Sequence, residues 1–263
     1  MTMTGVVREL NVFPLKSAGG TSLDEAHVTA GGLRHDRQFM LVRPDQRHLS
    51  QREAPRLALL RPGYDGAKLT VDAPDAVTPL VHEPTDGPAV NVSVHRQHCQ
   101  GVDQGDEAAD WFSAYLDTDC RLVRFSGVRH TERGGGTFAF ADEYPLLVLS
   151  LESLHDLNQR LTEPLPMNRF RPNIVLDGLG PYGEDTVSTL RIGDVEIDLI
   201  APCGRCVITT IDQDTGVRAK EPLRTLATYR TQTFNGERQI MFGRHAVPRT
   251  FGTITTQDTV TAT

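Results

Sequence analysis

The first part of the sequence is a succession of short β-like runs with no helical segment between them. Gly19-Gly20, Gly31-Gly32, Arg61-Pro62-Gly63 and Asp75 lie between the runs, and turns favour glycine, proline and aspartate. Short strands that are joined by turns, without helices, indicate a barrel or a sandwich. We therefore expect a mostly β (α+β) fold with an N-terminal β-barrel-like domain. The runs cover residues 6–12, 26–29, 38–42, 57–60, 68–72 and 90–94.

The second half of the sequence mixes helices with strands. Helices are expected at residues 106–116, after a capping Ser150, and from Glu221-Pro222. Residues 126–137 are polar and hold three consecutive glycines, which indicates a mobile loop. We place the domain boundary at this loop, so that the two domains are residues 1–125 and 126–263. Further strands are expected at residues 121–125, 145–149, 173–176, 189–192, 195–200 and 207–211, with a final strand pair at 252–254 and 259–260.

The charge of the chain limits its partners. Of its 263 residues, 27 are Lys or Arg and 34 are Asp or Glu, which gives a net charge of −7. Nucleic acids and anionic membranes bind basic surfaces, so we expect neither as a partner. No apolar run approaches the ~18 residues that a membrane-spanning helix needs. Residues 1–12 hold no basic segment followed by an apolar one, so no secretory signal is expected and the sequence predicts a cytoplasmic location.

Cys203 and Cys206 form a C-x-x-C pair that the residues alone leave open to four interpretations. The pair is half of a zinc site only if the fold recruits two more ligands. It is a thioredoxin-like redox pair only if a helix follows, and the β-branched run after Cys206 argues against one. It is also compatible with two half-buried thiols beside a strand. In the fourth interpretation one thiolate binds a soft redox metal, and Arg205 favours that thiolate electrostatically.

The other candidate cofactor sites are excluded by spacing. With Cys99 and Cys120 far from the pair, the four cysteines build neither a disulfide scaffold nor a ferredoxin-type iron–sulfur module. No dinucleotide fingerprint and no phosphate loop is present. His95 and His98 lie near an expected strand end, where histidines are more often solvent-facing than ligands. A redox enzyme built from this chain therefore takes its electrons from elsewhere.

Cations accompany hydrogen-bonding side chains at three expected turns. Such pairs form charge-assisted bonds to a phosphate or to a pterin-type ring. The alternative is surface charge that solvates loops. Their recurrence on an acidic chain favours a buried anionic ligand. The three turns are Lys16-Ser17, Arg34 to Arg37, and Arg171-Pro172-Asn173.

Five motifs in register resemble the MOSC family, named for the C-terminal domain of molybdenum-cofactor sulfurase. The chain is most similar to the branch that has an N-terminal β-barrel domain and includes the mitochondrial amidoxime reducing component. The resemblance implies a second, MOSC β-barrel with short helices in residues 126–263. The motifs are Phe13-Pro14-Leu15-Lys16-Ser17 (the family has Tyr first), Gly32-Leu33-Arg34-His35-Asp36-Arg37, Gln51-Arg52-Glu53-Ala54-Pro55-Arg56-Leu57, Phe170-Arg171-Pro172-Asn173-Ile174, and the C-x-R-C-x-x-T-T-x-D-x-x-T-G signature from Cys203 to Gly216.

The resemblance also implies roles for individual residues. The second cysteine of C-x-R-C ligates molybdenum in the family, so Cys206 is the expected metal ligand and catalytic residue, with Cys203 a neighbour. The expected ligands of the molybdenum cofactor (Mo-molybdopterin) come from both halves of the chain. Acidic side chains do not hold a phosphate. We therefore expect Asp142 to contact ring nitrogens of the cofactor, and Glu143 and Tyr144 to contact the cofactor through backbone N–H groups. The expected cofactor-binding residues are Lys16, Ser17, Arg37, Asp142, Glu143, Tyr144, Arg171, Asn173 and Cys206.

The activity that the resemblance implies is that of a molybdenum-dependent oxidoreductase. It reduces N-hydroxylated compounds (hydroxylamines, amidoximes and N-hydroxylated bases) by removing their oxygen atom at molybdenum. A separate electron-donor protein is expected, either a ferredoxin, a flavodoxin, or a cytochrome with its reductase. The alternative function is a non-catalytic carrier of the molybdenum cofactor or of sulfur that uses Cys206.

Overall fold

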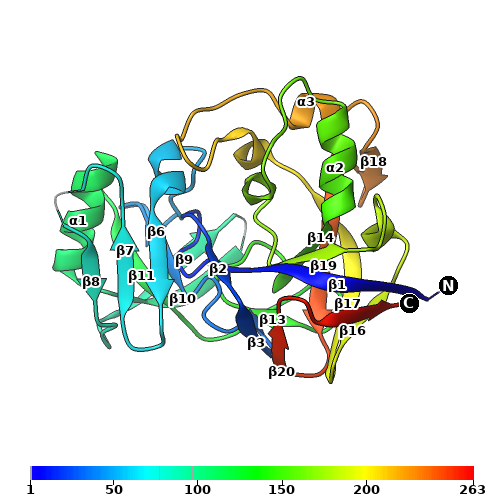
Figure 1. Ribbon diagram of the computed structural model, residues 1–263. Helices are drawn as coiled ribbons and strands as arrows, with labels where there is room; N and C mark the ends of the chain where they lie inside the picture. The colour runs from blue at the N-terminus through cyan, green and yellow to red at the C-terminus, as the bar shows by residue number, and fades with distance from the viewer. Residues whose placement is uncertain (1, 77, 96) are drawn as a thin grey trace.

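A computed structural model describes residues 2–76, 78–95 and 97–263 of the chain (Figure 1). It has two parts that lie side by side. One is a β-barrel near which both termini lie, and the other is a group of smaller sheets covered by one helix. Strands outnumber helices in both parts, so the expected mostly β fold is confirmed.

Seven strands close the barrel, because the pairing of β14 with β19 joins the two ends of the sheet. Only β14 and β15 run parallel, and the other neighbours are antiparallel. Inward-facing aliphatic side chains such as Leu10, Val148 and Ile197 fill the interior. In order around the barrel the strands are β14 (Leu146–Ser150), β15 (Ile174–Asp177), β1 (Met3–Val12), β21 (Thr259–Ala262), β16 (Thr189–Ile192), β17 (Val195–Gly204) and β19 (Glu237–Pro248).

Smaller elements surround the barrel. Helix α2 starts after Ser150, whose hydroxyl accepts a 3.2 Å hydrogen bond from the N–H of Ser153, as the sequence predicted for its cap. These elements are β2 (Thr21–Leu23) beside β1, β18 (Thr231–Phe234) beside β19, a sheet of β20 (Gly252–Thr255), β3 (Glu25–Thr29) and β4 (Gly32–Leu33), the pair β12 (Arg129–His130) and β13 (Thr137–Phe138), α2 (Leu151–Gln159), α3 (Leu223–Leu226), and the 3₁₀ turns η2 (Met167–Arg169), η3 (Gly183–Asp185) and η4 (Val207–Thr210).

The second part packs helix α1 (Asp106–Leu116) against two antiparallel sheets, and α1 spans the residues predicted for it. Phe112 and Leu116 of this helix share one apolar cluster with Leu15 and Phe39. This cluster anchors the chain that leaves the barrel after β1. The sheets are β5 (Phe39–Val42), β11 (Arg121–Ser126), β10 (Gln97–Asp103) and β9 (Ala89–Val94), and β6 (Arg61–Tyr64), β7 (Leu69–Asp72) and β8 (Leu80–His82), with the 3₁₀ turn η1 (Pro55–Leu59) beside them.

Three local predictions are wrong. Residues 57–60 lie mostly in η1, because Pro55 begins a 3₁₀ turn there. Residues 207–211 are not a strand, since η4 occupies 207–210. The last two strands do not pair with each other: β20 pairs with β3, whereas β21 pairs with β1 and β16.

The first strand joins the two halves of the chain. β1 pairs with β15 and β21, so residues 3–12 complete a barrel whose other strands come from the second half. The polar segment 126–137 carries the short hairpin of β12 and β13. The division of the chain into domains 1–125 and 126–263 stays a prediction from the sequence.

Candidate functional site

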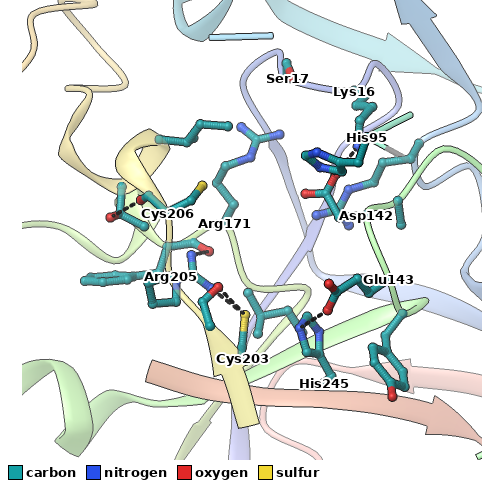
Figure 2. Close-up of a pocket in the computed structure, with 18 of the residues that line it drawn as sticks. Lys16, Ser17, His95, Asp142, Glu143, Arg171, Cys203, Arg205, Cys206 and His245 are labelled. Carbon is teal, nitrogen blue, oxygen red and sulfur yellow. Dashed lines mark hydrogen bonds and ion pairs between the residues drawn. The ribbon is translucent and has the colours of Figure 1, made fainter. Parts of the chain in front are cut away.

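A cavity of about 300 Å³ opens where the end of β17, the turn after β1 and the segment before β14 meet (Figure 2). All nine residues that the sequence singled out line this cavity. Their spatial convergence could not be derived from sequence spacing, because they come from five separate segments. They are Lys16, Ser17, Arg37, Asp142, Glu143, Tyr144, Arg171, Asn173 and Cys206.

A buried glutamine, Gln51, holds the turn that carries Lys16 and Ser17. The backbone of Ser17 is left-handed, with φ of 68°, a conformation that a residue with a side chain keeps only when its surroundings impose it. Gln51, which is fully buried, donates a 2.7 Å hydrogen bond to the Ser17 carbonyl. The N–H of Lys16 donates to the Phe39 carbonyl at 2.8 Å. The Gln51 motif thus positions the first motif.

Asp142 forms the charged centre of one wall. Its Oδ1 accepts hydrogen bonds from Lys16 Nζ at 2.5 Å and from His95 Nε2 at 2.9 Å. Burial raises the pKa of this carboxyl, but the Lys16 cation and His95 outweigh it and hold the pKa well below its usual value. Burial lowers the pKa of Lys16 despite Asp142. His95 is exposed, as its position in the sequence predicted, and its ring also lines the cavity.

Two arginines from different halves of the chain lie on the ring of Phe13. The guanidinium carbons of Arg37 and Arg171 are 4.4 and 4.3 Å from its centroid. Arg171 donates to the Ala18 carbonyl at 2.5 Å. Within the described ranges it has no carboxylate partner. Burial, together with nearby Arg37, lowers the pKa of Arg171 to about 9. This wall is a cationic surface suited to an anion.

Asn173 is a connector between strands and is 1% exposed. Its Oδ1 accepts from Arg37 Nη1 and from the N–H of Leu147, both at 3.1 Å. Its Nδ2 donates at 3.2 Å to Asp36 Oδ1 and to the Asn11 carbonyl. Its side chain thus sets the position of Arg37 and of the start of β14.

The two cysteines differ in burial because the backbone changes between them. Cys203 is the last inward residue in the alternating pattern of β17, and it is 5% exposed. Cys206 stands at the start of η4 and is exposed. The hydroxyls of Thr209 and Thr210 donate to the carbonyls of Cys206 and Val207 at 2.9 and 2.7 Å. Such local bonds compete with a strand, which explains why the β-branched run forms a turn.

Arg205 connects Cys203 to the segment that carries Phe170. Its Nη1 donates to Cys203 Sγ at 3.0 Å and its Nη2 to the Phe170 carbonyl at 2.7 Å. Burial raises the pKa of the Cys203 thiol, but Arg205 and His245 outweigh burial and lower it to about 7. Among the described residues, those of this site included, no group of three or more His, Cys, Asp or Glu side chains is placed to hold a metal ion, so the zinc interpretation gains no support.

The turn after η4 follows the Asx pattern that its aspartates and glycine indicate. Asp212 Oδ1 accepts from the N–H groups of Asp214 and Thr215 at 3.0 and 2.9 Å. Its Oδ2 accepts from Arg169 Nη2 at 2.7 Å. This turn carries Gln213, whose side chain reaches Gln51 below the Ser17 turn.

His245 is the functional candidate that sequence reasoning missed. It lies on β19, its ring stacks on Tyr144 with 4.8 Å between centroids, and its Nε2 is 3.6 Å from Glu143 Oε2. Burial lowers its pKa, but Cys203 and Glu143 outweigh burial and raise it. No motif surrounds His245, so only its strand position could have been predicted. His48 and Arg52 also line the cavity and were not selected as site residues.

Comparison with known proteins assigns both halves of the chain. Residues 4–119 match the family model of the MOSC N-terminal beta barrel domain, and residues 135–261 match that of the MOSC domain. The chain is 36% identical to mitochondrial amidoxime-reducing component 1 of Mus musculus and of Homo sapiens, over 99% of this chain and 83% of each relative. It is 38% identical to mitochondrial amidoxime reducing component 2 of Bos taurus, over 88% of this chain and 74% of the relative.

These relatives contradict the cytoplasmic location that the sequence predicted, since they are named mitochondrial components. The prediction was wrong because it tested residues 1–12 only for a secretory signal, and mitochondrial targeting uses a different kind of segment. None of the helices in the described ranges has both the length and the hydropathy that crossing a bilayer requires. With both domain models matched in order and relatives aligned over most of its length, the chain belongs to the MOSC family, with the MOSC N-terminal β-barrel domain and alongside the amidoxime-reducing components.

Proposed function

We propose that this protein is a molybdenum-cofactor-dependent reductase of N-hydroxylated compounds, including hydroxylamines, amidoximes and N-hydroxylated bases. Relatives that align with 88% or more of the chain are named amidoxime-reducing components. The observation that carries the proposal is one cavity in which the exposed thiol of Cys206 faces the cations Lys16, Arg37 and Arg171. A soft ligand for a redox metal and a surface for its anionic organic part thus lie together.

The donor set of the cavity fits Mo-molybdopterin. Cys206 would ligate the metal, since its thiol is exposed at the start of η4. Arg171, a cation with no carboxylate partner among the described residues, would bind the anionic part, with Lys16 and Ser17 on the facing turn. Asp142 Oδ1 is occupied by Lys16 and His95, which leaves Oδ2 for ring N–H groups. The bound cofactor would supply an oxygen-accepting centre of two electrons.

The remaining expected residues position the side chains that surround the cavity. Asn173 holds Arg37, and its own amide is occupied by protein partners. Tyr144 and Glu143 contact His245 and line the same side of the cavity. Cys203 is held by Arg205 and stays a neighbour of the ligand. Preorganisation of this kind keeps a substrate at the metal in a fixed orientation.

Electrons reach the site from a separate protein in this proposal. The chain has neither a nucleotide fingerprint nor the cysteines for an iron–sulfur module of its own. A ferredoxin, a flavodoxin, or a cytochrome with its reductase would serve as donor. The substrate is a small molecule that carries an N–O bond.

Metal and pterin analysis of the purified protein, followed by turnover, tests the proposal. We expect molybdenum and pterin in equal amounts, and reduction of benzamidoxime or a hydroxylamine by the dye-reduced protein. Zinc in place of molybdenum would contradict the metal assignment. Bound cofactor without turnover would favour the carrier function.

A pair of matched variants tests the ligand. Cys206→Ser is expected to abolish turnover and to lower the molybdenum content while the fold is retained. Cys203→Ser is expected to retain molybdenum and to lose only part of the activity. Equal loss of molybdenum in both variants would contradict the assignment of Cys206 as the metal ligand.

A further inference from the structure

A second cavity of about 410 Å³ adjoins the first one. The loop between β12 and β13 and the hairpin of β18 and β19 border it, and Arg133 Nη2 donates across its rim to Asn235 Oδ1 at 3.0 Å. Because the two cavities have six lining residues in common, a shared wall separates them. The residues of this wall are His95, Asp142, Glu143, Tyr144, Gly204 and His245.

His245 stands in the shared wall with a different partner on each side. Figure 2 shows Glu143 beside one edge of the imidazole and Cys203 near the other. Its Nε2 is 3.6 Å from Glu143 Oε2, and the Cys203 thiol is within hydrogen-bonding range of the ring. The side chain of His245 is 14% exposed, whereas that of Glu143 is 69% exposed. The pair thus runs from solvent in the second cavity to the interior of the first.

Reduction of an N–OH group consumes protons as well as electrons: R–NH–OH + 2e⁻ + 2H⁺ gives R–NH₂ + H₂O. The N–O bond breaks, one N–H bond and one O–H bond form, and the substrate is reduced. The donor protein would supply the electrons, and the bound cofactor would supply the centre that accepts the oxygen. Cys206 as a metal ligand has no proton to give, so another group in the cavity must supply the protons.

We propose that His245 is the proton donor of the reduction and that Glu143 reloads it with protons from the second cavity. This inference rests on the proposed function. His245 gives up a proton to the leaving oxygen or to the nitrogen in the first cavity, and its neutral ring then takes a new proton through the exposed carboxylate of Glu143. Tyr144, stacked on the imidazole, restricts the orientation of the ring.

The electrostatic surroundings of His245 agree with this role. Burial lowers its pKa, but the Cys203 thiolate and Glu143 outweigh burial, and the net pKa is raised even though Arg205 opposes it. The facing residue of β14 is Leu147 and that of β17 is Ala201, so neither adds a charge next to the ring.

The other two histidines of the first cavity are unsuited to the task. Burial and the Lys16 cation lower the pKa of His48 to about 3, so His48 stays neutral. His95 donates its Nε2 hydrogen to Asp142, which also holds Lys16. Among the histidines that line the cavity, His245 is thus the one placed between an exposed carboxylate, Glu143, and the interior thiol of Cys203.

Two substitutions test the inference in the cofactor-loaded protein with a reduced dye as electron source. His245→Gln keeps a side chain of similar size that does not titrate, and kcat should fall by about 10²-fold with KM little changed. In the wild type kcat falls as pH rises through the pKa of His245, and this limb should be absent in His245→Gln. Glu143→Gln removes a charge that raises this pKa, so the limb should move to lower pH. His155→Gln, at an exposed position of α2, is the matched control and should change neither quantity.

Two further readouts separate proton transfer from a structural role. Added imidazole should restore part of the activity of His245→Ala. NMR of the labelled imidazoles in the wild type should give a pKa for His245 above the usual histidine value, and this pKa should fall in Glu143→Gln. The NMR readout does not depend on turnover.

The outcomes are distinguishable. Wild type without molybdenum or without turnover contradicts the proposed function. An active wild type whose rate and pH profile survive in His245→Gln overturns the proton-donor role alone. If His245→Gln loses molybdenum, Glu143→Gln becomes the deciding variant. A pH profile of kcat that is unchanged in Glu143→Gln then overturns the proposal.

Discussion

Gln51 and Gln213 exchange two side-chain hydrogen bonds of 3.1 Å, although 162 residues separate them in the sequence. Both side chains are buried, at 0% and 5% exposure. Gln51 also donates to the Ser17 carbonyl, and Gln213 to the Ile211 carbonyl. The pair therefore couples the turn of Lys16 and Ser17 to the turn that follows η4. Two of the motifs that the sequence shows separately are one structural unit.

Loss of the hydrogen bonds between Gln51 and Gln213 should lower the stability of the fold and weaken the support of the turn that carries Lys16 and Ser17. Gln51→Ala leaves the Ser17 carbonyl and the Gln213 amide buried without their partner, which costs about 1–3 kcal/mol of unfolding free energy. Denaturant unfolding measures the loss, and pterin content of the purified variant should fall with it. Gln100→Ala, at an exposed position of β10, is the matched control. Equal stability of the two variants would show that the Gln51 amide does not hold the turn.

The ion pair of Asp142 and Lys16 predicts a stability difference that depends on pH. The pKa of Asp142 is held below its usual value, so the carboxylate stabilises the fold above the unfolded pKa of about 3.9, and this stability is lost as pH falls through the folded pKa. At pH 7 Asp142→Asn should lower the unfolding free energy by about 1 kcal/mol, because the carboxylate is 56% exposed and solvent screens it.

Chemical unfolding at several pH values checks this. The difference between wild type and Asp142→Asn should start to shrink near pH ~4, where the carboxyl of the unfolded chain takes up a proton, and should vanish only as pH falls through the lower pKa of the folded state. Asp86→Asn, a carboxylate exposed at the surface that pairs with Arg124, should show little difference at any of these pH values. A constant difference across the pH range would contradict the pairing with Lys16 as its source.

The ionisation of Cys203 is set by Arg205. With the pKa of the thiol at about 7, roughly half of Cys203 is thiolate at neutral pH. Arg205→Gln removes the largest influence that opposes burial, so the pKa should rise. NMR of proteins labelled at the cysteine Cβ follows the titration, and Cys203→Ser identifies the signal. Arg191→Gln, at an exposed arginine paired with Glu196, should leave the titration unchanged. The same midpoint in both arginine variants would refute the role of Arg205.

Elements whose cause is local were predicted from local sequence signals. Helix α1 and the Ser150 cap of α2 follow from apolar spacing and from one hydroxyl, and both were predicted. The run 207–211 has the composition of a strand, yet Thr209 and Thr210 bond back to the preceding turn, and no propensity scale contains that competition.

The residues of the site likewise divide into those that the sequence predicts and those that only the fold reveals. Nine cofactor-binding residues were selected from the sequence through its resemblance to a family, and all nine line the cavity. His245 was missed because its role comes from the barrel: β19 brings it beside Cys203 of β17 and Glu143 before β14. The participation of β1 in the barrel likewise depends on strand pairing between distant segments, which spacing alone does not reveal.

Arg171 offers a prediction in which stability and cofactor binding move in opposite directions. A half-buried cation that has no carboxylate partner among the described residues costs free energy until an anion binds beside it, and its lowered pKa of about 9 agrees with that cost. Arg171→Met replaces the cation with an uncharged, unbranched side chain that can still pack on the Phe13 ring. Cofactor-free Arg171→Met should therefore be at least as stable as cofactor-free wild type in thermal unfolding. Its content of pterin and molybdenum after purification should nevertheless be several-fold lower, because the anionic part of the cofactor loses its partner. Arg191→Met, at the surface, should change neither quantity. A destabilised Arg171→Met with normal cofactor content would mean that Arg171 serves the fold through its bond to Ala18 and not the binding of an anion.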